Sequence, residues 1–169
     1  SPNFPEIVKR SRGVADGMSK GIEFLMKKNK IDVLSGTGKL KPGKKVDVTA
    51  EDNTVTEYSA DHIIIATGAR SRELPNLPMD GEKVIGYRKA MTLETLPKKM
   101  IIVGSGAIGI EFAYVYNALG TEVTVVEFLP NIVPLEDEDV SKQLGRSLKK
   151  QGIKIMTNSS VESVDTKGK

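Results

Sequence analysis

The chain has 169 residues, 38% of them apolar and 28% charged, with a formal net charge of +3. This composition is typical of one ordinary folded domain or two small ones, and no apolar run reaches the length that spans a membrane. Acids and bases are interspersed and tryptophan is absent, so we expect neither a nucleic-acid nor a membrane partner. No signal peptide is visible, and we expect a cytoplasmic location.

Cysteine is absent and histidine occurs once. These residues therefore contain no disulfide, thiolate metal site, cysteine nucleophile or conventional Ser-His-Asp triad. We expect no metal site. The chain opens on Ser-Pro-Asn without a methionine, and we expect it to begin inside a longer polypeptide.

Residues 4–28 are expected to form one long helix, because apolar side chains recur along them at helical spacing among basic residues. Gly13, Gly17 and Gly21 weaken this helix, each by up to about 1 kcal/mol relative to alanine. Glycines at four-residue intervals allow another element to approach closely. A helix contact and a cofactor contact are both compatible with this pattern.

Strand periodicity follows the helix. Residues 31–34 are a short apolar run, residues 35–38 a turn, and residues 46–49 and 54–58 a hairpin across residues 50–53. The alternating polarity predicts a small antiparallel sheet with a solvated, charged face.

Residues 60–67 end in a continuous apolar run, which predicts a strand buried on both faces of a parallel sheet. The small residues at its carboxyl end allow a ligand to approach the backbone closely. We expect His62 to be an edge residue rather than a catalytic base. Residues 71–81 contain Pro75 and Pro78 and are expected to connect two domains, and residues 89–96 to form a short helical turn.

The most informative stretch is residues 100–127. It predicts a strand at residues 100–103, a glycine turn, a helix over residues 107–119 ended by Gly120, and a β-branched strand at residues 121–126. In the turn, Gly104 permits the tight bend, Gly106 lets the backbone approach a pyrophosphate, and Gly109 lets the helix pack on the strand. The free N–H groups and dipole of the helix start favour an anion there.

Glu127 ends the second strand, 23 residues after Gly104. This is near the spacing of the acid that accepts hydrogen bonds from an adenosine ribose diol in dinucleotide-binding βαβ units. Residues 128–140 contain no Lys or Arg to meet a ribose phosphate. The pattern therefore predicts a dinucleotide site that favours NAD over NADP.

Four acids at residues 136–139 are expected to begin a helix that runs to about Gln151. Acids at a helix start are stabilised by the helix dipole, and we prefer this explanation to metal binding. Strands are expected at residues 153–156 and 161–164.

The chain as a whole resembles the dihydrolipoamide dehydrogenases, flavoproteins within the pyridine nucleotide-disulfide oxidoreductases. The matching motifs are residues 35–39 (SGTGK), 62–68 (HIIIATG), 103–111 (VGSGAIGIE) and 126–130 (VEFLP). Ile108 stands where related glutathione reductases typically have a tyrosine, which favours a lipoamide enzyme.

The resemblance implies an α/β fold with two parts. Residues 73–169 would form a nearly complete Rossmann-type NAD-binding domain. Residues 1–72 would be the incomplete C-terminal part of an FAD-binding domain and would contain the small antiparallel sheet.

The resemblance also implies site residues for both cofactors. Glu111 matches a carboxylate at the flavin edge, which implies a catalytic role, although it could simply be an early-helix acid. Val161 matches a residue whose backbone meets the NAD adenine, although it could be a core residue. The FAD-binding set is Gly38, Thr67, Gly68 and Ala69, and the NAD-binding set is Gly104, Ser105, Gly106, Ala107, Ile108, Gly109, Glu127 and Val161.

The implied parent enzyme is a homodimer that oxidises dihydrolipoamide and reduces NAD. Its partner is the dihydrolipoyl domain of a 2-oxo acid dehydrogenase complex or of the glycine cleavage system. These residues lack the redox cysteine pair, the first FAD fingerprint and the C-terminal domain, so the fragment alone is expected to be inactive. NADH oxidases and coenzyme A disulfide reductases share most of these features, and a stand-alone NAD-binding module is a further alternative.

The two parts are expected to differ in order. Residues 83–164 carry most of a Rossmann core and are expected to fold alone. Residues 1–69 lack strands to pair with, so we expect them to be poorly ordered or to pair with another chain through exposed strand edges.

Overall fold

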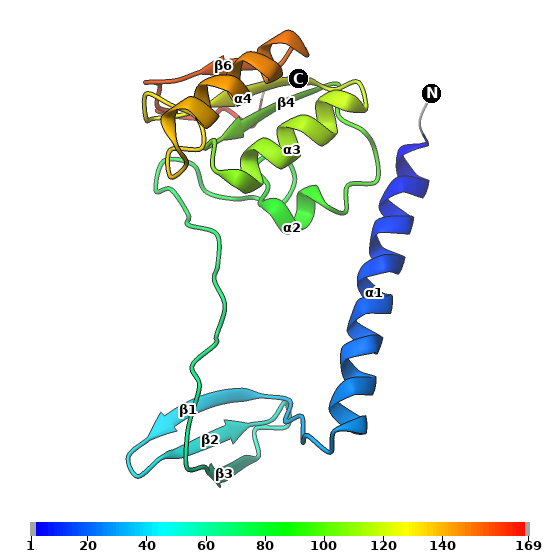
Figure 1. Cartoon of the computed structure of the whole chain (residues 1–169), viewed down its shortest axis with the longest axis vertical. Coiled ribbons are helices and arrows are strands. Elements are labelled where there is room, and N and C mark those ends of the chain that lie inside the picture. Colours follow the sequence, from blue (N-terminus) through cyan, green and yellow to red (C-terminus); the bar gives the residue numbers. More distant parts are fainter. Residues whose placement is uncertain (1–2, 168–169) are drawn as a thin grey trace. The chain divides into compact units, whose positions relative to one another are not determined.

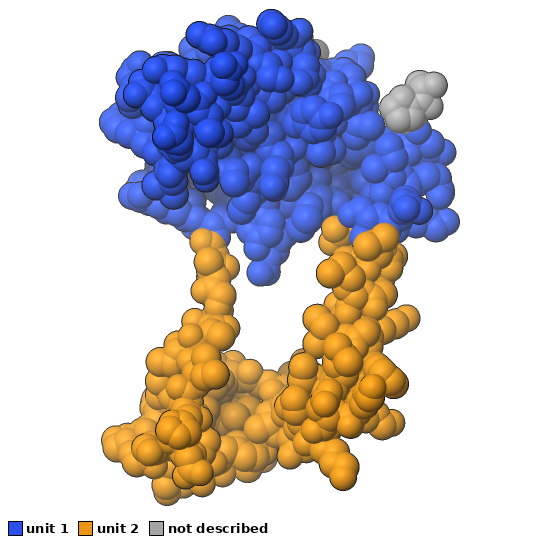
Figure 2. All heavy atoms as spheres, in the orientation of Figure 1, with its two compact units in different colours: residues 1–11, 71–169 blue, residues 12–70 orange. Residues whose placement is uncertain are grey.

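The computed structural model describes residues 3–167. The chain divides into two units, each compact through its internal contacts: unit 1 (Ser1–Ser11 and Ser71–Lys169) and unit 2 (Arg12–Arg70) (Figure 2). The elements in chain order (Figure 1) are α1 (Phe4–Lys28), β1 (Thr37–Lys41), β2 (Lys45–Thr49), β3 (Val55–Ser59), α2 (Tyr87–Ala90), β4 (Lys99–Val103), α3 (Ala107–Ala118), β5 (Glu122–Val126), α4 (Glu138–Lys150) and β6 (Lys154–Met156).

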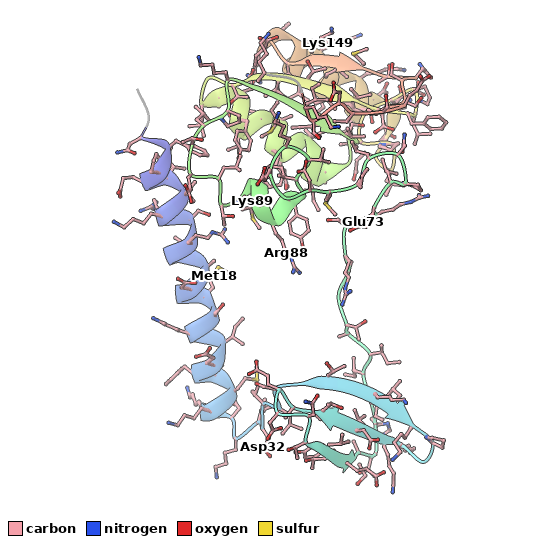
Figure 3. The ribbon with its side chains drawn as sticks, turned by 180° about the vertical axis from the view of Figure 1, so that it is seen from behind. Met18, Asp32, Glu73, Arg88, Lys89 and Lys149 are labelled. Carbon is pink, nitrogen blue, oxygen red and sulfur yellow. The ribbon has the colours of Figure 1, made fainter. Side chains whose placement is uncertain are left out.

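Helix α1 has the bounds that the apolar spacing predicts. Its first residues belong to unit 1, where Phe4 is buried, and its remainder belongs to unit 2. In unit 2 most of its apolar side chains are exposed, and Figure 3 shows Met18 projecting from the helix. A methyl group added at Gly13, Gly17 or Gly21 would have no neighbour within 4 Å. Among the described residues nothing approaches these glycines closely.

Unit 2 contains an antiparallel sheet in the order β1-β2-β3. The predicted hairpin of β2 and β3 is confirmed, and the N–H of Ala50 donates to the carbonyl of Thr54 across the turn. The predicted turn at residues 35–38 is partly wrong, because Thr37 and Gly38 already belong to β1 and pair with β2. Gly36 makes the bend instead, with φ of +152°. Residues 31–34 are not a strand.

The charged side chains of this sheet form ion pairs at its surface. Lys41 lies 2.9 Å from Glu57 and 3.2 Å from Asp47, and Lys45 lies 2.6 Å from Glu57. Hydrogen bonds from Lys45 and then Lys41 lower the pKa of Glu57 to about 2. All four groups remain in contact with solvent, as the predicted solvated face requires.

The buried strand predicted at residues 60–67 is wrong. The structure has no strand there, and Ile64 and Ile65 are 89% and 68% exposed. An apolar segment forms a buried parallel strand only when neighbouring strands satisfy its backbone and cover its faces. None of the strands described pairs with these residues.

Unit 1 is built on a parallel sheet in the order β4-β5-β6. Helices α3 and α4 make the crossovers and lie on the same face of this sheet (Figure 1), as right-handed βαβ connections require. The predicted α/β fold with a small antiparallel sheet is therefore confirmed. The core under the helices comprises Phe4, Ile110, Ala113, Tyr116, Val123, Val125, Ile132, Val133, Leu148 and Ile153.

The start of α4 and the last predicted strand of unit 1 differ from the predictions. Helix α4 begins at Glu138, because Asp137 is its N-cap and its side chain accepts a hydrogen bond from the N–H of Asp139. The strand predicted at residues 161–164 is absent. Instead the side-chain amide of Asn76 donates to the carbonyls of Val161 and Glu162, which satisfies these groups without a ladder.

The helices of residues 3–167 include none that is long and apolar enough to cross a membrane.

Candidate functional site

The glycine turn lies between the carboxyl end of β4 and the start of α3. Gly104 has φ of +100°, a conformation that favours glycine, and its N–H donates to the carbonyl of Val126 at 2.9 Å. A Cβ at Gly109 would lie 2.3 Å from the carbonyl oxygen of Gly104. The helix therefore packs so closely on the turn that only glycine fits at residue 109, the environment that the spacing predicts.

Gly106 is the N-cap of α3 and has different surroundings. Its backbone is extended, with φ of −64° and ψ of 174°, and a Cβ built there would have no neighbour within 4 Å. No side chain caps the start of this helix. The backbone at Gly106 is therefore open, next to N–H groups that carry the positive end of the helix dipole.

Glu127 follows β5 and its carboxylate is held at the turn. Its Oε2 accepts hydrogen bonds from the N–H and the hydroxyl of Ser105, at 2.8 and 2.6 Å. Its Oε1 accepts one from the N–H of Leu129 at 2.8 Å. Glu127, the acid predicted from the spacing, is therefore hydrogen-bonded to Ser105, the second residue of the glycine turn.

The Glu127 side chain is buried, with 7% of the residue exposed. Burial raises the pKa of its carboxyl group, but the hydrogen bonds from Leu129 and Ser105 outweigh burial and hold this pKa below its ordinary value. The group is therefore an anion at neutral pH, with its charge distributed among fixed donors.

Ser105 is completely buried. Its carbonyl accepts a hydrogen bond from the N–H of Val133 at 2.9 Å, in addition to the two bonds that it donates to Glu127. Val133 has φ of +41°, an unusual conformation for a β-branched residue. The turn is thereby fixed both to the end of β5 and to the loop that follows it.

The segment after β6 lies beside the same edge of the sheet. The N–H of Ser159 donates to the carbonyl of Glu127 at 2.9 Å, and the N–H of Asn158 donates to that of Leu129 at 3.1 Å. Val161, two residues beyond Ser159, is half-buried. These bonds place the segment that carries Val161 next to Glu127 and Leu129.

The first two turns of α3 carry the remaining predicted residues of unit 1. Ala107 and Glu111 are exposed, and Ile108 is 56% exposed. Their side chains are therefore free to meet a ligand, and the roles that the resemblance implies for them stay predictions.

The residues assigned to FAD do not form a site among the described residues. Gly38 lies on β1, and Thr67, Gly68 and Ala69 lie in the extended segment of unit 2. All four are exposed. Their predicted contacts with a flavin remain predictions.

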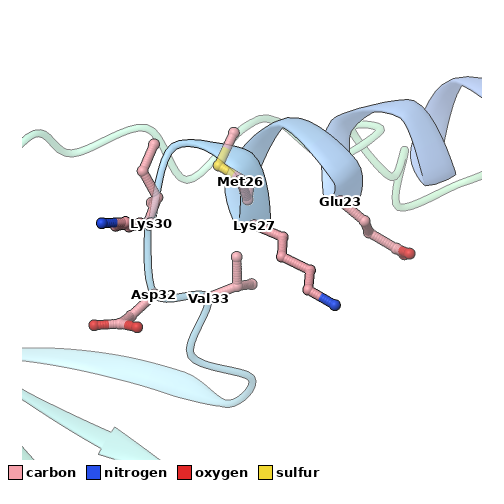
Figure 4. A pocket seen from close by; sticks show the side chains of 7 residues that line it. Glu23, Met26, Lys27, Lys30, Asp32 and Val33 are labelled. Atoms are coloured by element: carbon pink, nitrogen blue, oxygen red, sulfur yellow. The ribbon is translucent and has the colours of Figure 1, made fainter.

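Two shallow hollows lie elsewhere. One of about 470 Å³, shown in Figure 4, lies in unit 2 where α1 ends, and charged residues of both signs line it beside apolar ones. The other, of about 360 Å³, is formed by the loop after β5 and the start of α4 and carries Glu136 and Glu138. Neither is lined by a predicted site residue. Within residues 3–167 no cluster of three or more His, Cys, Asp or Glu could hold a metal ion.

The bond between Ser105 and Glu127 was not predicted from the sequence. The available signal was a hydroxyl residue between two glycines of the turn, together with an acid at the end of the next strand. The contacts of Asn76 with Val161 and Glu162 carry no local sequence signal, because the partners are about 85 residues apart.

Comparisons with known proteins agree with this geometry. The family described as "Pyridine nucleotide-disulphide oxidoreductase" matches residues 1–169. The chain is 42% identical over 165 residues to dihydrolipoyl dehydrogenase of Zymomonas mobilis, covering 96% of this chain and 35% of that protein. It is 44% identical over 179 residues to dihydrolipoyl dehydrogenase of Rhizobium etli, covering 97% of this chain and 37% of that protein.

Among solved structures, LpdA from Mycobacterium tuberculosis aligns with a TM-score of 0.90 and 32% sequence identity. The alignment covers 99% of this chain and 38% of LpdA. The chain thus spans about a third of the length of the curated relatives it matches. The family expectation is confirmed: the chain belongs to the pyridine nucleotide-disulfide oxidoreductases.

Proposed function

We propose that these residues are the NAD-binding part and a segment of the FAD-binding part of a dihydrolipoyl dehydrogenase. The full-length enzyme would oxidise the dihydrolipoyl group of a 2-oxo acid dehydrogenase complex or of the glycine cleavage system and reduce NAD. Relatives with this name are 42–44% identical to the chain. A cytoplasmic location and a homodimer are part of the same proposal.

The observation that supports the NAD site is an unobstructed glycine turn beside the carboxylate of Glu127, which hydrogen bonds hold in place. The backbone at Gly106 is unobstructed at the start of α3, where a diphosphate would meet free N–H groups. Glu127 lies at the end of the adjacent strand and would accept hydrogen bonds from the adenosine ribose. The residues present therefore fit a dinucleotide.

The charges around this turn favour NAD over NADP. Residues 128–140, which follow Glu127, contain no Lys or Arg. A ribose 2′-phosphate would meet the Glu127 carboxylate without a compensating cation from this loop.

The flavin proposal rests on family membership alone, because the described residues do not form a flavin site. A bound flavin would pass electrons between the dithiol and the nicotinamide. No cysteine occurs in these residues, so the redox disulfide would belong to other parts of the full-length protein. The residues of this chain would bind and orient the dinucleotide.

The test is an assay of the full-length protein with its native cofactors. We expect NAD⁺ reduction with dihydrolipoamide to exceed NADH oxidation by oxygen and by coenzyme A disulfide. Faster turnover with oxygen or coenzyme A disulfide would instead identify an NADH oxidase or another disulfide reductase. Nucleotide binding without turnover in any of these assays would favour a stand-alone binding module.

A further inference from the structure

Ser105 is completely buried, so it does not offer its hydroxyl to a ligand at the surface. Both of its donors, the N–H and the hydroxyl, point to one oxygen of Glu127. We propose that Ser105 is a positioning residue for nucleotide choice, which holds the Glu127 carboxylate in the orientation that accepts an adenosine ribose diol. This inference rests on the NAD site proposed above.

The two carboxylate oxygens of Glu127 differ in their hydrogen-bond partners. The two bonds from Ser105 use the acceptor capacity of Oε2. Oε1 accepts a bond from the N–H of Leu129 and none from Ser105 among the hydrogen bonds described, and the backbone of Phe128 also interacts with this carboxylate. A ribose hydroxyl would therefore meet Oε1, and Ser105 sets the direction in which this oxygen points.

A further hydrogen bond, to the carbonyl of Ser105, fixes the position of this residue. The N–H of Val133 donates to its carbonyl at 2.9 Å, and Val133 is buried in the core of unit 1. Ser105 therefore cannot follow Glu127 if the carboxylate rotates. A donor fixed in this way lowers the entropy that Glu127 would lose on binding a nucleotide.

Removing the hydroxyl should affect NAD⁺ and NADP⁺ differently. The ribose diol of NAD⁺ donates hydrogen bonds to the oriented Glu127 carboxylate. NADP⁺ carries a phosphate in place of one of these hydroxyls, so the orientation of the carboxylate does not strengthen its binding. The pyrophosphate and nicotinamide halves of the two nucleotides are the same. Loss of orientation should weaken NAD⁺ alone, whereas general loosening of the turn should weaken both.

The experiment measures the dissociation constants of NAD⁺ and NADP⁺ by calorimetry on the oxidised full-length holoprotein. For Ser105→Ala we expect affinity for NAD⁺ to fall about tenfold, as for loss of one hydrogen bond to a charged group. Affinity for NADP⁺ should change less than about twofold. In a Glu127→Ala background, Ser105→Ala should lower NAD⁺ affinity by less than about a further twofold, because the coupled partner is gone.

The matched control is Thr121→Val. Thr121 is also buried, and its hydroxyl donates to the carbonyl of Pro97 at 2.7 Å, at the opposite end of the strand from Glu127. This variant loses a similar hydrogen bond and should lower the melting temperature without changing either dissociation constant. Ser105→Gly, which also removes the hydroxyl, takes the place of Ser105→Ala if the latter does not fold.

The outcomes separate this inference from the proposed function. Equal weakening of NAD⁺ and NADP⁺ by Ser105→Ala, or an undiminished effect in the Glu127→Ala background, would overturn the positioning role. If Glu127→Ala lowers NAD⁺ affinity and Ser105→Ala does not, the NAD site stands and the role of Ser105 fails. If Glu127→Ala leaves NAD⁺ affinity unchanged, the proposed ribose contact itself is wrong.

Discussion

Gly106 and Gly109 lie three residues apart in the same turn, yet they impose different constraints on the molecule. A Cβ at Gly109 would collide with the backbone of Gly104, at 2.3 Å, whereas one at Gly106 would meet only open space. The absence of a side chain at Gly106 therefore leaves space for a ligand at the turn, and its absence at Gly109 lets α3 pack against the turn.

This difference gives a prediction at the scale of the residue. Gly109→Ala should lower the free energy of unfolding by roughly 1–3 kcal/mol, because the backbone must shift to admit the methyl group. Gly106→Ala should leave stability unchanged or raise it by about 0.4–1 kcal/mol, while NAD⁺ affinity falls. Thermal unfolding and calorimetric titration of the two variants test this. Equal stabilities of the two variants would contradict the packing seen at Gly109.

At the scale of the element, the acids that precede α4 have a structural use. Asp137 caps the helix, and Glu138 and Asp139 lie in its first turn. Lys149 and Lys150 lie in the last turn. Charges of the appropriate sign therefore stabilise both ends of the helix dipole.

Asp137→Ala should lower the free energy of unfolding of unit 1 by about 1 kcal/mol, the usual cost of losing an N-cap. The control is Asp137→Asn, whose amide oxygen still accepts the bond from Asp139 but carries no charge. We expect the asparagine variant to retain most of the stability in a denaturant titration. A loss as large as that of the alanine variant would show that charge, and not the cap, is what stabilises α4.

The ion pairs of the antiparallel sheet predict a pH dependence. The pKa of Glu57 is lowered from 4.5 to about 2 by Lys45 and Lys41. A carboxyl whose pKa is lower in the folded state stabilises the fold above the unfolded pKa, and this contribution disappears as the pH falls from about 4.5 to about 2. Carbon-13 titration of the Glu57 carboxyl should give a midpoint near 2, moving upward in Lys45→Gln. A midpoint near 4.5 would mean that the pairs do not persist in solution.

At the scale of the whole molecule, the apolar core belongs to unit 1. Every buried hydrophobic residue of the described chain lies there, including Phe4, whose ring centroid is 6.1 Å from that of Tyr116. Unit 2 leaves most of its large apolar side chains exposed, among them Ile64 and Val33. Burial of apolar surface is the main favourable contribution to folding, so the two units should differ in stability.

Hydrogen exchange of the 169-residue chain tests this difference. Amides of β4, β5 and α3 should exchange slowly, through cooperative unfolding, whereas those of residues 61–70 should exchange close to the unprotected rate. Sedimentation run in parallel shows whether the chain is monomeric. Equal protection of both units in a monomer would contradict the prediction, whereas protection of unit 2 only in an oligomer would indicate pairing through its strand edges.

The predictions from sequence succeeded where structure depends on neighbours along the chain. Gly120 and Gly152 end their helices with positive φ, and the apolar spacing of α1 predicted both of its ends. These features follow from local backbone preferences and from periodicity, which a sequence displays directly. The same reasoning failed at residues 60–67, where an apolar run predicts a strand but no strand forms, because pairing depends on segments distant in the sequence.

The sequence by itself determined the order of elements in residues 100–127, the positions of the three glycines, the acid at the end of β5 and the family. Only the tertiary structure showed that Ser105 and Glu127 are hydrogen-bonded, that Phe4 joins the core of unit 1, and that Asn76 holds Val161. The physical reason is that glycine sterics and helical periodicity act between residues close in the sequence. Hydrogen bonds and packing across 22 or 85 residues exist only when the fold brings the partners together.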